Sequence, residues 1–202
     1  MHGRPPVRET RGMPDKLKIA VILASTRPER VGPAVADWVM EGTADREAAT
    51  YTLVDLADQN LPLLDEPEPA SSGTYTHEHT RAWSELVTGF DGFVFVTPEY
   101  NRGIPGALKN SLDFLYAEWN DKAAAICCYG SSGGLRVAEQ LKLVLGELQI
   151  ATVRSQVSIS IYDDMTDFSV MSPRDYQPRN RASMFDQVER WAGALRPLRS
   201  AD

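Results

Sequence analysis

The sequence predicts an α/β protein in which helices cover both faces of a parallel β-sheet. Apolar runs of strand length alternate with amphipathic segments of helical length, which is the order that parallel sheets require. The strand runs are apolar throughout, as expected for strands buried on both faces. The chain has 202 residues, 43% of them hydrophobic and 24% charged, which is the size and composition of one globular domain. We therefore expect one doubly wound domain.

The first half of the chain contains two strands and two helices. Residues 18–24 (KIAVILA) form a continuous β-branched run, and 51–56 form a second strand. Between them, Pro33 suits the first turn of a helix that ends near Gly42. A long irregular stretch with three prolines follows at 57–74, and apolar spacing then predicts a helix over 77–90.

The second half repeats this alternation and ends on a helix. The clearest helical stripe in the chain includes Val137, Leu141 and Leu145. The expected elements are a strand at 92–97, a helix at 104–119, a strand at 123–129, a helix at 137–148, a strand at 152–161, a polar loop at 162–181 and a closing helix at 184–195.

Charge and cysteine content narrow the function classes. A net charge of −7 argues against a nucleic-acid partner, since such partners require a basic face. No apolar run approaches the ~18 residues of a membrane span, and the first 16 residues lack the apolar segment of a secretory signal, so we expect a cytoplasmic protein. Cys127 and Cys128 are adjacent, which points their side chains to opposite faces of a strand. We expect both to be buried free thiols in a reducing compartment, and we expect no metal site.

Three loops follow the carboxyl ends of strands, where open parallel sheets bind their ligands. The first, 25–32, is rich in hydroxyls and arginine and leads into a helix, which favours an anion site; a capped, solvated helix start is the alternative. The second, 97–106, has two prolines and two glycines that fix a rigid turn suited to a planar ligand. The third, 129–134, is glycine-rich and allows close approach of a flat ring; a plain helix start with Ser131 or Ser132 as its N-cap is the alternative.

These three loops together resemble those of a known family. The run TPEYNRGIPGALKNSLD at 97–113, supported by ASTR at 24–27 and YGSSGG at 129–134, is similar to the NADPH-dependent FMN reductase family, over roughly residues 16–195. The resemblance implies a flavodoxin-like three-layer sandwich with a five-stranded parallel sheet in the order 2-1-3-4-5. It also implies a flexible extension at 1–15, an FMN-binding domain at 16–196 and a tail at 197–202.

The resemblance implies FMN as cofactor and assigns residues to it. The phosphate is expected on Ser25 and Arg27 and on the backbone at Val31, Gly32, Pro33 and Ala34. Glu29 is expected to face solvent, because it would repel a phosphate. The isoalloxazine ring is expected against two sets of residues: Pro98, Glu99, Tyr100 and Asn101, and Gly130, Ser131, Ser132, Gly133 and Gly134. Backbone donors at 99–101 or 130–134 are expected to face the flavin.

The implied activity is that of a two-electron oxidoreductase. NAD(P)H is the expected co-substrate, and a quinone-like or other small acceptor, or free flavin, is expected to follow it in ping-pong order. The flavin carries the chemistry, so no side chain is assigned a catalytic role. Two alternatives remain, a flavodoxin-type one-electron carrier and a flavin-binding module without turnover.

A homodimer or homotetramer is also expected. The segment after the second loop carries more apolar and aromatic side chains than one side of a sheet needs: Leu108, Leu112, Phe114, Leu115, Tyr116 and Trp119. We expect a second subunit to bury part of them, and the family resemblance agrees. The alternative is that they pack inside the same chain under the 57–74 stretch.

Overall fold

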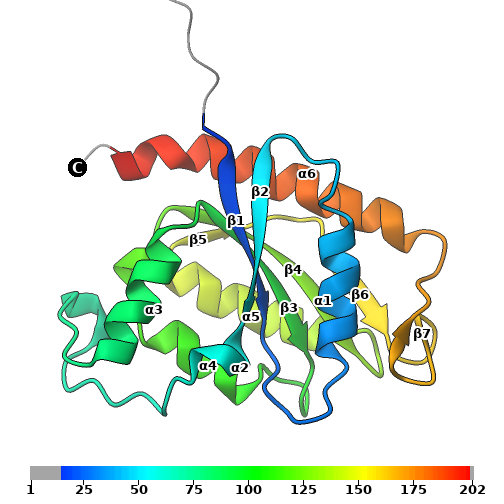
Figure 1. Ribbon diagram of the computed structural model, residues 1–202, viewed down its shortest axis with the longest axis horizontal. Helices are drawn as coiled ribbons and strands as arrows, with labels where there is room; N and C mark the ends of the chain where they lie inside the picture. The colour runs from blue at the N-terminus through cyan, green and yellow to red at the C-terminus, as the bar shows by residue number, and fades with distance from the viewer. Residues whose placement is uncertain (1–14, 201–202) are drawn as a thin grey trace, which may run out of the picture.

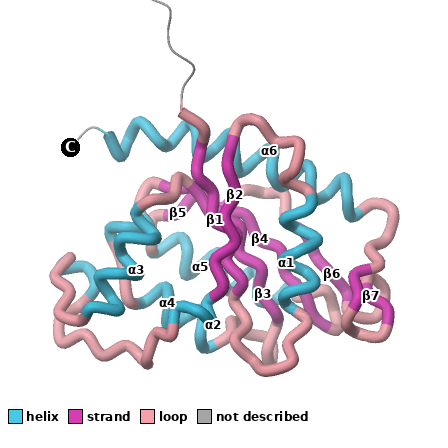
Figure 2. The backbone as a smooth tube through the Cα atoms, in the orientation of Figure 1, coloured by secondary structure: helices cyan, strands magenta, loops and turns pink. Residues whose placement is uncertain are grey.

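Parallel strands form the centre of the molecule in this computed structural model, which describes residues 15–200 (Figures 1 and 2). The main sheet has the order β2-β1-β3-β4-β5, with β6 also paired to β4, and all of its pairs are parallel. This confirms the predicted order. The strands are β1 (Leu17–Leu23), β2 (Ala49–Asp55), β3 (Gly92–Pro98), β4 (Lys122–Gly130), β5 (Ile150–Thr152) and β6 (Val157–Ser160).

The fifth position of the sheet is occupied by two short strands. The prediction of one continuous strand at 152–161 is wrong, because β5 pairs with the first residues of β4 and β6 with its last ones. Val153 N still donates to Ala124 O of β4 at 2.9 Å, and residues 154–156 then leave the ladder. The amide of Ser155 donates to Gln187 Oε1 of α6 at 2.9 Å instead of bonding to β4, which accounts for the break.

Helices cover the sheet in two layers. Val35, Trp38 and Val39 of α1 (Gly32–Glu41) and Met184, Phe185 and Val188 of α6 (Gln177–Leu195) pack on one face, with Ile19 and Val21 of β1. The other face is covered by α3 (Glu78–Thr88), α4 (Gly106–Asp113) and α5 (Leu135–Glu147), which bury Trp83, Leu108 and Leu141 against Phe93 and Phe95. The alternation of side chains along each strand supplies both clusters.

Three predicted boundaries are wrong. The helix expected at 104–119 ends at Asp113 and is followed by a short 3-10 helix, Ala117–Trp119. The closing helix begins at Gln177 rather than at 184, because its polar first turns, with Pro178, lack an apolar stripe. The loop expected at 162–181 contains a small hairpin, β7 (Met165–Thr166) and β8 (Val170–Met171). The long 57–74 stretch is irregular as expected, apart from α2 (Leu56–Gln59) and the 3-10 turn Ala70–Ser72.

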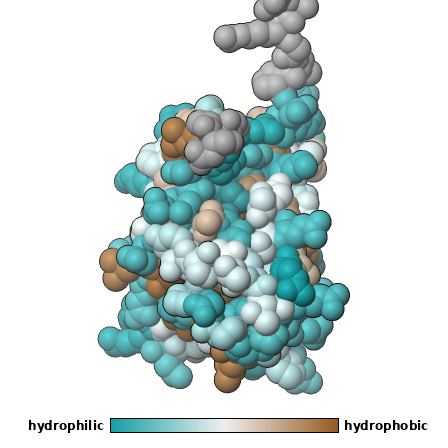
Figure 3. All heavy atoms as spheres, turned by 90° about the vertical axis from the view of Figure 1, so that its left-hand side faces the viewer, coloured by the Kyte–Doolittle hydropathy of each residue, from teal (hydrophilic) through white to brown (hydrophobic). Residues whose placement is uncertain are grey.

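The side chains expected at a subunit interface lie inside the protein's own core. Leu108, Leu112, Phe114, Leu115 and Trp119 are at most 1% exposed and Tyr116 is half-buried. The face that carries α3 and the long loop is mainly hydrophilic, with scattered hydrophobic side chains (Figure 3). The argument for a dimer from these residues is therefore wrong, and the alternative of packing within one chain is correct.

Two further expectations concern the cysteines and membranes. Cys127 and Cys128 are free and buried, as predicted. Among residues 15–200, none of the helices combines the length and the apolar character needed to cross a membrane. The expected extension at 1–15 and the end of the tail fall almost wholly outside the described residues, so these boundaries stay predictions.

Candidate functional site

The three predicted loops meet around one cavity at the carboxyl ends of β1, β3 and β4. Its volume is about 260 Å³. The residues that line it are Arg27, Arg30, Val31, Pro98, Glu99, Tyr100, Tyr129, Gly130, Ser131 and Ile161. Seven of these were predicted from the sequence, and Arg30, Tyr129 and Ile161 were not.

The start of α1 lies at this cavity, which Val31 lines. Val31 is its N-cap, no side chain caps the helix, and no acidic residue lies in the first turn. The predicted residues Gly32, Pro33 and Ala34 form that turn. Uncapped N–H groups and the positive end of the helix dipole favour an anion. Glu29 is exposed, as expected, so the arrangement fits a phosphate.

Two arginines of the first loop point to different places. Arg27 is exposed at the cavity. Arg30 is half-buried and donates to the backbone oxygen of Ser25 and to the carboxylate of Asp55, at the end of β2. Asp55 in turn caps α2 by accepting from Ala57 N at 2.9 Å. Arg30 therefore ties the loop to the sheet, which leaves Arg27 as the exposed guanidinium of the pair.

Ser25 is fully buried, which sequence reasoning did not foresee. Its Oγ is hydrogen-bonded to the hydroxyl of Tyr100 at 2.7 Å, and Tyr100 is 37% exposed. The Ser25 hydroxyl is therefore already engaged in this conformation. A ligand at Ser25 would therefore have to share this bond or replace it.

The loop after β3 is a tight turn. Tyr100 and Gly103 exchange two backbone hydrogen bonds, of 3.2 and 2.9 Å, and Asn101 and Arg102 form the exposed tip with φ angles of 50° and 67°. The Glu99 amide donates to the Tyr129 carbonyl at 2.9 Å. The amides of Glu99 and Tyr100 are therefore used within the protein, which leaves Asn101 and the loop after β4 for the predicted backbone donors.

The Glu99 side chain links this loop to the next helix. Its carboxylate accepts from the backbone amide of Arg136 at 3.1 Å and from the Arg136 guanidinium at 2.7 Å. Arg136 lies in the first turn of α5, so Glu99 satisfies a donor at that helix start from a distance. The loop after β3 and the start of α5 are therefore held in a fixed relation.

The loop after β4 depends on its glycines. Gly133 and Gly134 have φ angles of 76° and 72°, and a Cβ on Gly134 would lie 2.8 Å from the backbone N of Tyr129. The N-cap of α5 is Gly134, so the alternative in which Ser131 or Ser132 caps the helix is wrong. Both serines are exposed instead.

Tyr129 and Ile161 enter the site from strand ends. Tyr129 directly precedes the glycines of the third loop. The sequence interpretation included it in that loop but assigned it no ligand contact. Ile161 follows β6, and its amide donates to the Gly130 carbonyl at 3.1 Å. Its position depends on how β6 pairs with β4. No local sequence motif predicts that pairing, so Ile161 could not be identified from the sequence.

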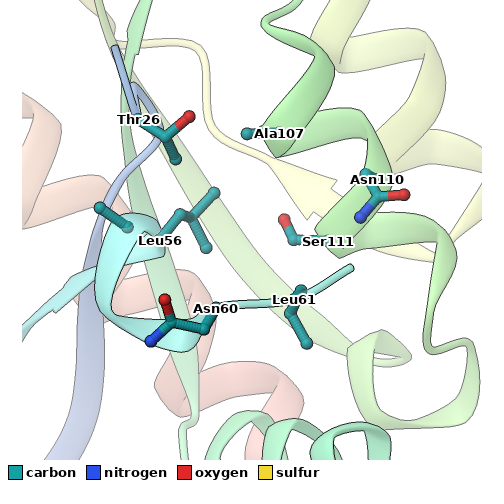
Figure 4. Close-up of a pocket in the computed structure, with 8 residues that line it drawn as sticks. Thr26, Leu56, Asn60, Leu61, Ala107, Asn110 and Ser111 are labelled. Carbon is teal, nitrogen blue, oxygen red and sulfur yellow. The ribbon is translucent and has the colours of Figure 1, made fainter. Parts of the chain in front are cut away.

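A second cavity of about 260 Å³ lies on the other side of the first loop, between α2 and α4 (Figure 4). Thr26, Leu56 and Asn60 form one wall and face Ala107 and Ser111 of α4. The amide side chain of Asn110 is used to hold the long loop, since it accepts from Leu64 N at 2.9 Å and donates to Pro62 O at 2.7 Å.

Other parts of the described chain offer no comparable site. Two larger cavities, of about 480 and 820 Å³, lie at the amino ends of the strands, away from the loops. His77 and His79 stack on each other, and His79 contacts Asp65 at 3.0 Å. Within residues 15–200 there is no group of three or more His, Cys, Asp or Glu side chains that could hold a metal ion.

Comparison with known proteins identifies the family of this chain. The sequence model of a family described as NADPH-dependent FMN reductase matches residues 17–164. An NAD(P)H-dependent FMN reductase of Schizosaccharomyces pombe is 42% identical over 168 residues, which cover 80% of this chain and 84% of the relative. A quinone reductase of Pseudomonas putida is 32% identical over 123 residues, covering 57% of this chain and 62% of the relative.

The fold agrees as well. The FerB flavoenzyme of Paracoccus denitrificans, an NAD(P)H:(acceptor) oxidoreductase, superposes with a TM-score of 0.67 at 18% sequence identity, over 89% of this chain and 98% of that one. At this identity the superposition speaks for the fold alone, and the family match rests on the sequence. Since the matched region extends from the first strand past all three loops, this chain belongs to the NADPH-dependent FMN reductase family.

Proposed function

We propose that this protein holds FMN in the 260 Å³ cavity and passes two electrons from NAD(P)H to a small quinone-like acceptor. One observation carries the assignment of the site. The uncapped start of α1, with no acidic side chain in its first turn, opens on a cavity that Arg27 also lines. Such a set of donors suits a single phosphate group.

The residues present fit FMN better than a larger dinucleotide. Arg27 and the backbone of Val31–Ala34 would hold the phosphate, and Pro98–Asn101 and Gly130–Gly134 would flank the ring. The first loop lacks the G-x-G-x-x-G pattern that binds a pyrophosphate, so we expect FMN rather than FAD.

Bound FMN supplies the electron chemistry, since it accepts a hydride from NAD(P)H and returns two electrons to an acceptor. The chain's own contribution is position. The Glu99–Arg136 contact and the Tyr100–Gly103 turn fix the two loops that flank the ring. No side chain is assigned as acid or base.

The size of the cavity favours two substrates that bind in turn. Small-molecule pockets usually measure about 300–1,000 Å³. A cavity of about 260 Å³ leaves part of a bound flavin exposed, where NAD(P)H and then the acceptor can reach it. The overall reaction converts NAD(P)H, a proton and a quinone into NAD(P)⁺ and a hydroquinone. The Pseudomonas putida relative, a quinone reductase, supports this acceptor class.

We also propose a cytoplasmic location and a homodimer or homotetramer. The two free, buried cysteines, which are typical of a reducing compartment, motivate the location. The family resemblance motivates the assembly.

Chromatography of the flavin released from the purified protein tests the cofactor, and FAD or no flavin would contradict the proposal. Oxidation of NADPH and NADH is then followed with benzoquinone as acceptor, and stoichiometric hydroquinone is expected. A flavin-containing protein that oxidises neither nucleotide would instead support the one-electron carrier or the binding module.

A further inference from the structure

A buried hydroxyl without a partner lies beneath the first turn of α1. Tyr129 is 3% exposed, and its Oη makes no hydrogen bond within the described chain. Buried polar atoms in native proteins are nearly always paired, so an orphan calls for an explanation such as an absent ligand. Tyr129 also lines the 260 Å³ cavity, which places a ligand site beside it.

The position of this hydroxyl relative to the helix is set by a glycine. A Cβ on Gly32 would lie 2.7 Å from Tyr129 Oη and 2.8 Å from Leu23 Cδ1. Both distances are too short for any side chain, so only glycine lets the phenol approach the helix backbone this closely. Gly32 is the first residue of α1, and the hydroxyl therefore lies at the end of the helix that lacks a cap.

The neighbours of the phenol leave it as a neutral donor. Burial raises the pKa of Tyr129 and the nearby Tyr100 adds to this, while the Ser25 hydroxyl and Arg30 act against it more weakly. The Ser25 Oγ bonds to Tyr100 and the Arg30 guanidinium to Ser25 O and Asp55, and neither group makes a hydrogen bond to Tyr129 Oη. The O–H of Tyr129 remains without an acceptor, and a phosphate consists of acceptors.

We propose that the Tyr129 hydroxyl donates a hydrogen bond to the phosphate of the bound cofactor and so distinguishes FMN from riboflavin. This rests on the proposed FMN site. Since Oη is closed off from solvent, the residues that cover it must move apart as the phosphate enters. Tyr129 is then a specificity residue for the phosphate group, added to the donors of Arg27 and the helix start.

The test is Tyr129→Phe, which removes only the hydroxyl, with Tyr51→Phe as the matched control. Tyr51 is largely buried too, but its hydroxyl has a partner, Glu189 Oε1, at 2.7 Å. Three quantities are measured on full-length protein freed of flavin: the Tm, the Kd for FMN and for riboflavin, and the Tm increase caused by inorganic phosphate.

Tyr129→Phe is expected to raise the Kd for FMN by about 10- to 150-fold, as for a hydrogen bond to a charged group. The Kd for riboflavin is expected to stay within about twofold, and the phosphate-induced Tm increase is expected to shrink. The Tm without ligand should hold or rise by about 2–4 °C, because an unpaired buried hydroxyl is removed. Tyr51→Phe should do the opposite, with a lower Tm and unchanged affinities.

Three results would overturn the inference: an unchanged Kd for FMN, an equal loss of affinity for FMN and riboflavin, or a Tm that falls as in Tyr51→Phe. If the wild type binds no flavin, the proposed function itself fails. The measurement with inorganic phosphate then still tests Tyr129. An equal phosphate-induced Tm increase in wild type and Tyr129→Phe excludes a hydrogen bond from Tyr129 to phosphate. A Tm increase that is lost only in Tyr129→Phe supports it.

Discussion

Two arginines three positions apart in one loop illustrate how little residue type says about role. Arg27 is exposed at the cavity, whereas Arg30 turns back to Ser25 and Asp55. A loop rich in arginine predicts an anion site, but it does not say which guanidinium reaches the anion and which holds the loop. The structure separates the two roles.

Arg27→Ala is expected to weaken FMN binding by about 10- to 150-fold, the value of one hydrogen bond to a charged group, with the Tm of the flavin-free protein unchanged. Arg30→Ala, in contrast, is expected to lower the Tm of the flavin-free protein, because it leaves Asp55 without its cation. Flavin fluorescence titration and thermal unfolding measure both. If a folded Arg27→Ala protein binds FMN with unchanged affinity, Arg27 does not contact the phosphate.

A lysine is buried at the amino end of β4, opposite the three loops. Lys122 is 3% exposed, and its Nζ donates to the Val87 carbonyl at 2.8 Å and to the Thr88 carbonyl at 3.3 Å, at the end of α3. Burial lowers the pKa of Lys122 from 10.5 to about 7, and Arg199 adds to this. The folded state therefore binds fewer protons than the unfolded state between these two values.

This difference predicts a pH dependence of stability. As pH rises from about 7 towards 10.5, the wild type gains free energy of unfolding relative to Lys122→Met, by up to about 1.4 kcal/mol per pH unit. Urea unfolding of both proteins at several pH values in this range measures the gain. Lys142→Met, which removes a lysine paired with Glu139 on the surface of α5, should show no such trend. If the difference in free energy of unfolding between wild type and Lys122→Met does not change with pH, the pKa of Lys122 is not lowered by folding.

At the scale of elements, the loops after β3 and β4 act as one unit because Glu99 bonds to Arg136 and the Gly134 backbone crosses close to Tyr129. The close approach requires glycine for two reasons, the positive φ of 72° and the space that a Cβ would need. The glycine loop is therefore needed for the fold itself as well as for any ring that binds to it.

Gly134→Ala is expected to lower the free energy of unfolding by about 1–3 kcal/mol or more, given the strain of a left-handed alanine and the contact with Tyr129 N. Gly146→Ala is the control, because that glycine lies within α5 with no atom within 4 Å of its Cβ position. It should stabilise the protein by about 0.4–1 kcal/mol. Chemical denaturation measures both, and equal effects would contradict the argument.

The sequence predicted the elements that have a strong local signal and missed those set by distant contacts. The apolar runs and helical stripes located β1, β3, β4, α3 and α5 closely, and the sheet order and family are confirmed. The break between β5 and β6 was missed because a contact with Gln187, more than 30 residues away, causes it. Helix α6 was started late because its first turns are polar.

The same division holds for the site. The three loops were found because their composition is unusual, and they do meet at one cavity. The engagement of Ser25 by Tyr100 could not be read from the sequence, since the partners are 75 positions apart. The assignment of individual residues to FMN stays a prediction.

For the whole molecule, the assembly state is the open expectation. We predict a homodimer, or a dimer of dimers, although the aromatic residues first offered for its interface are buried within one chain. Light scattering of the FMN-loaded protein at low micromolar concentration measures it. A monomer that holds FMN and oxidises NAD(P)H would contradict the prediction.

The adjacent cysteines give each helical layer its own chemical reporter. Cys127 packs with the α1 and α6 layer and Cys128 with the α3, α4 and α5 layer, and burial raises the pKa of both thiols, that of Cys128 to about 12. Neither reacts while its layer is closed, because thiolates do the alkylation. The alkylation rates of Cys127 and Cys128, measured by peptide mapping, therefore report the opening rates of the two layers separately. Equal rates would mean that the sheet loses both covers in one cooperative event.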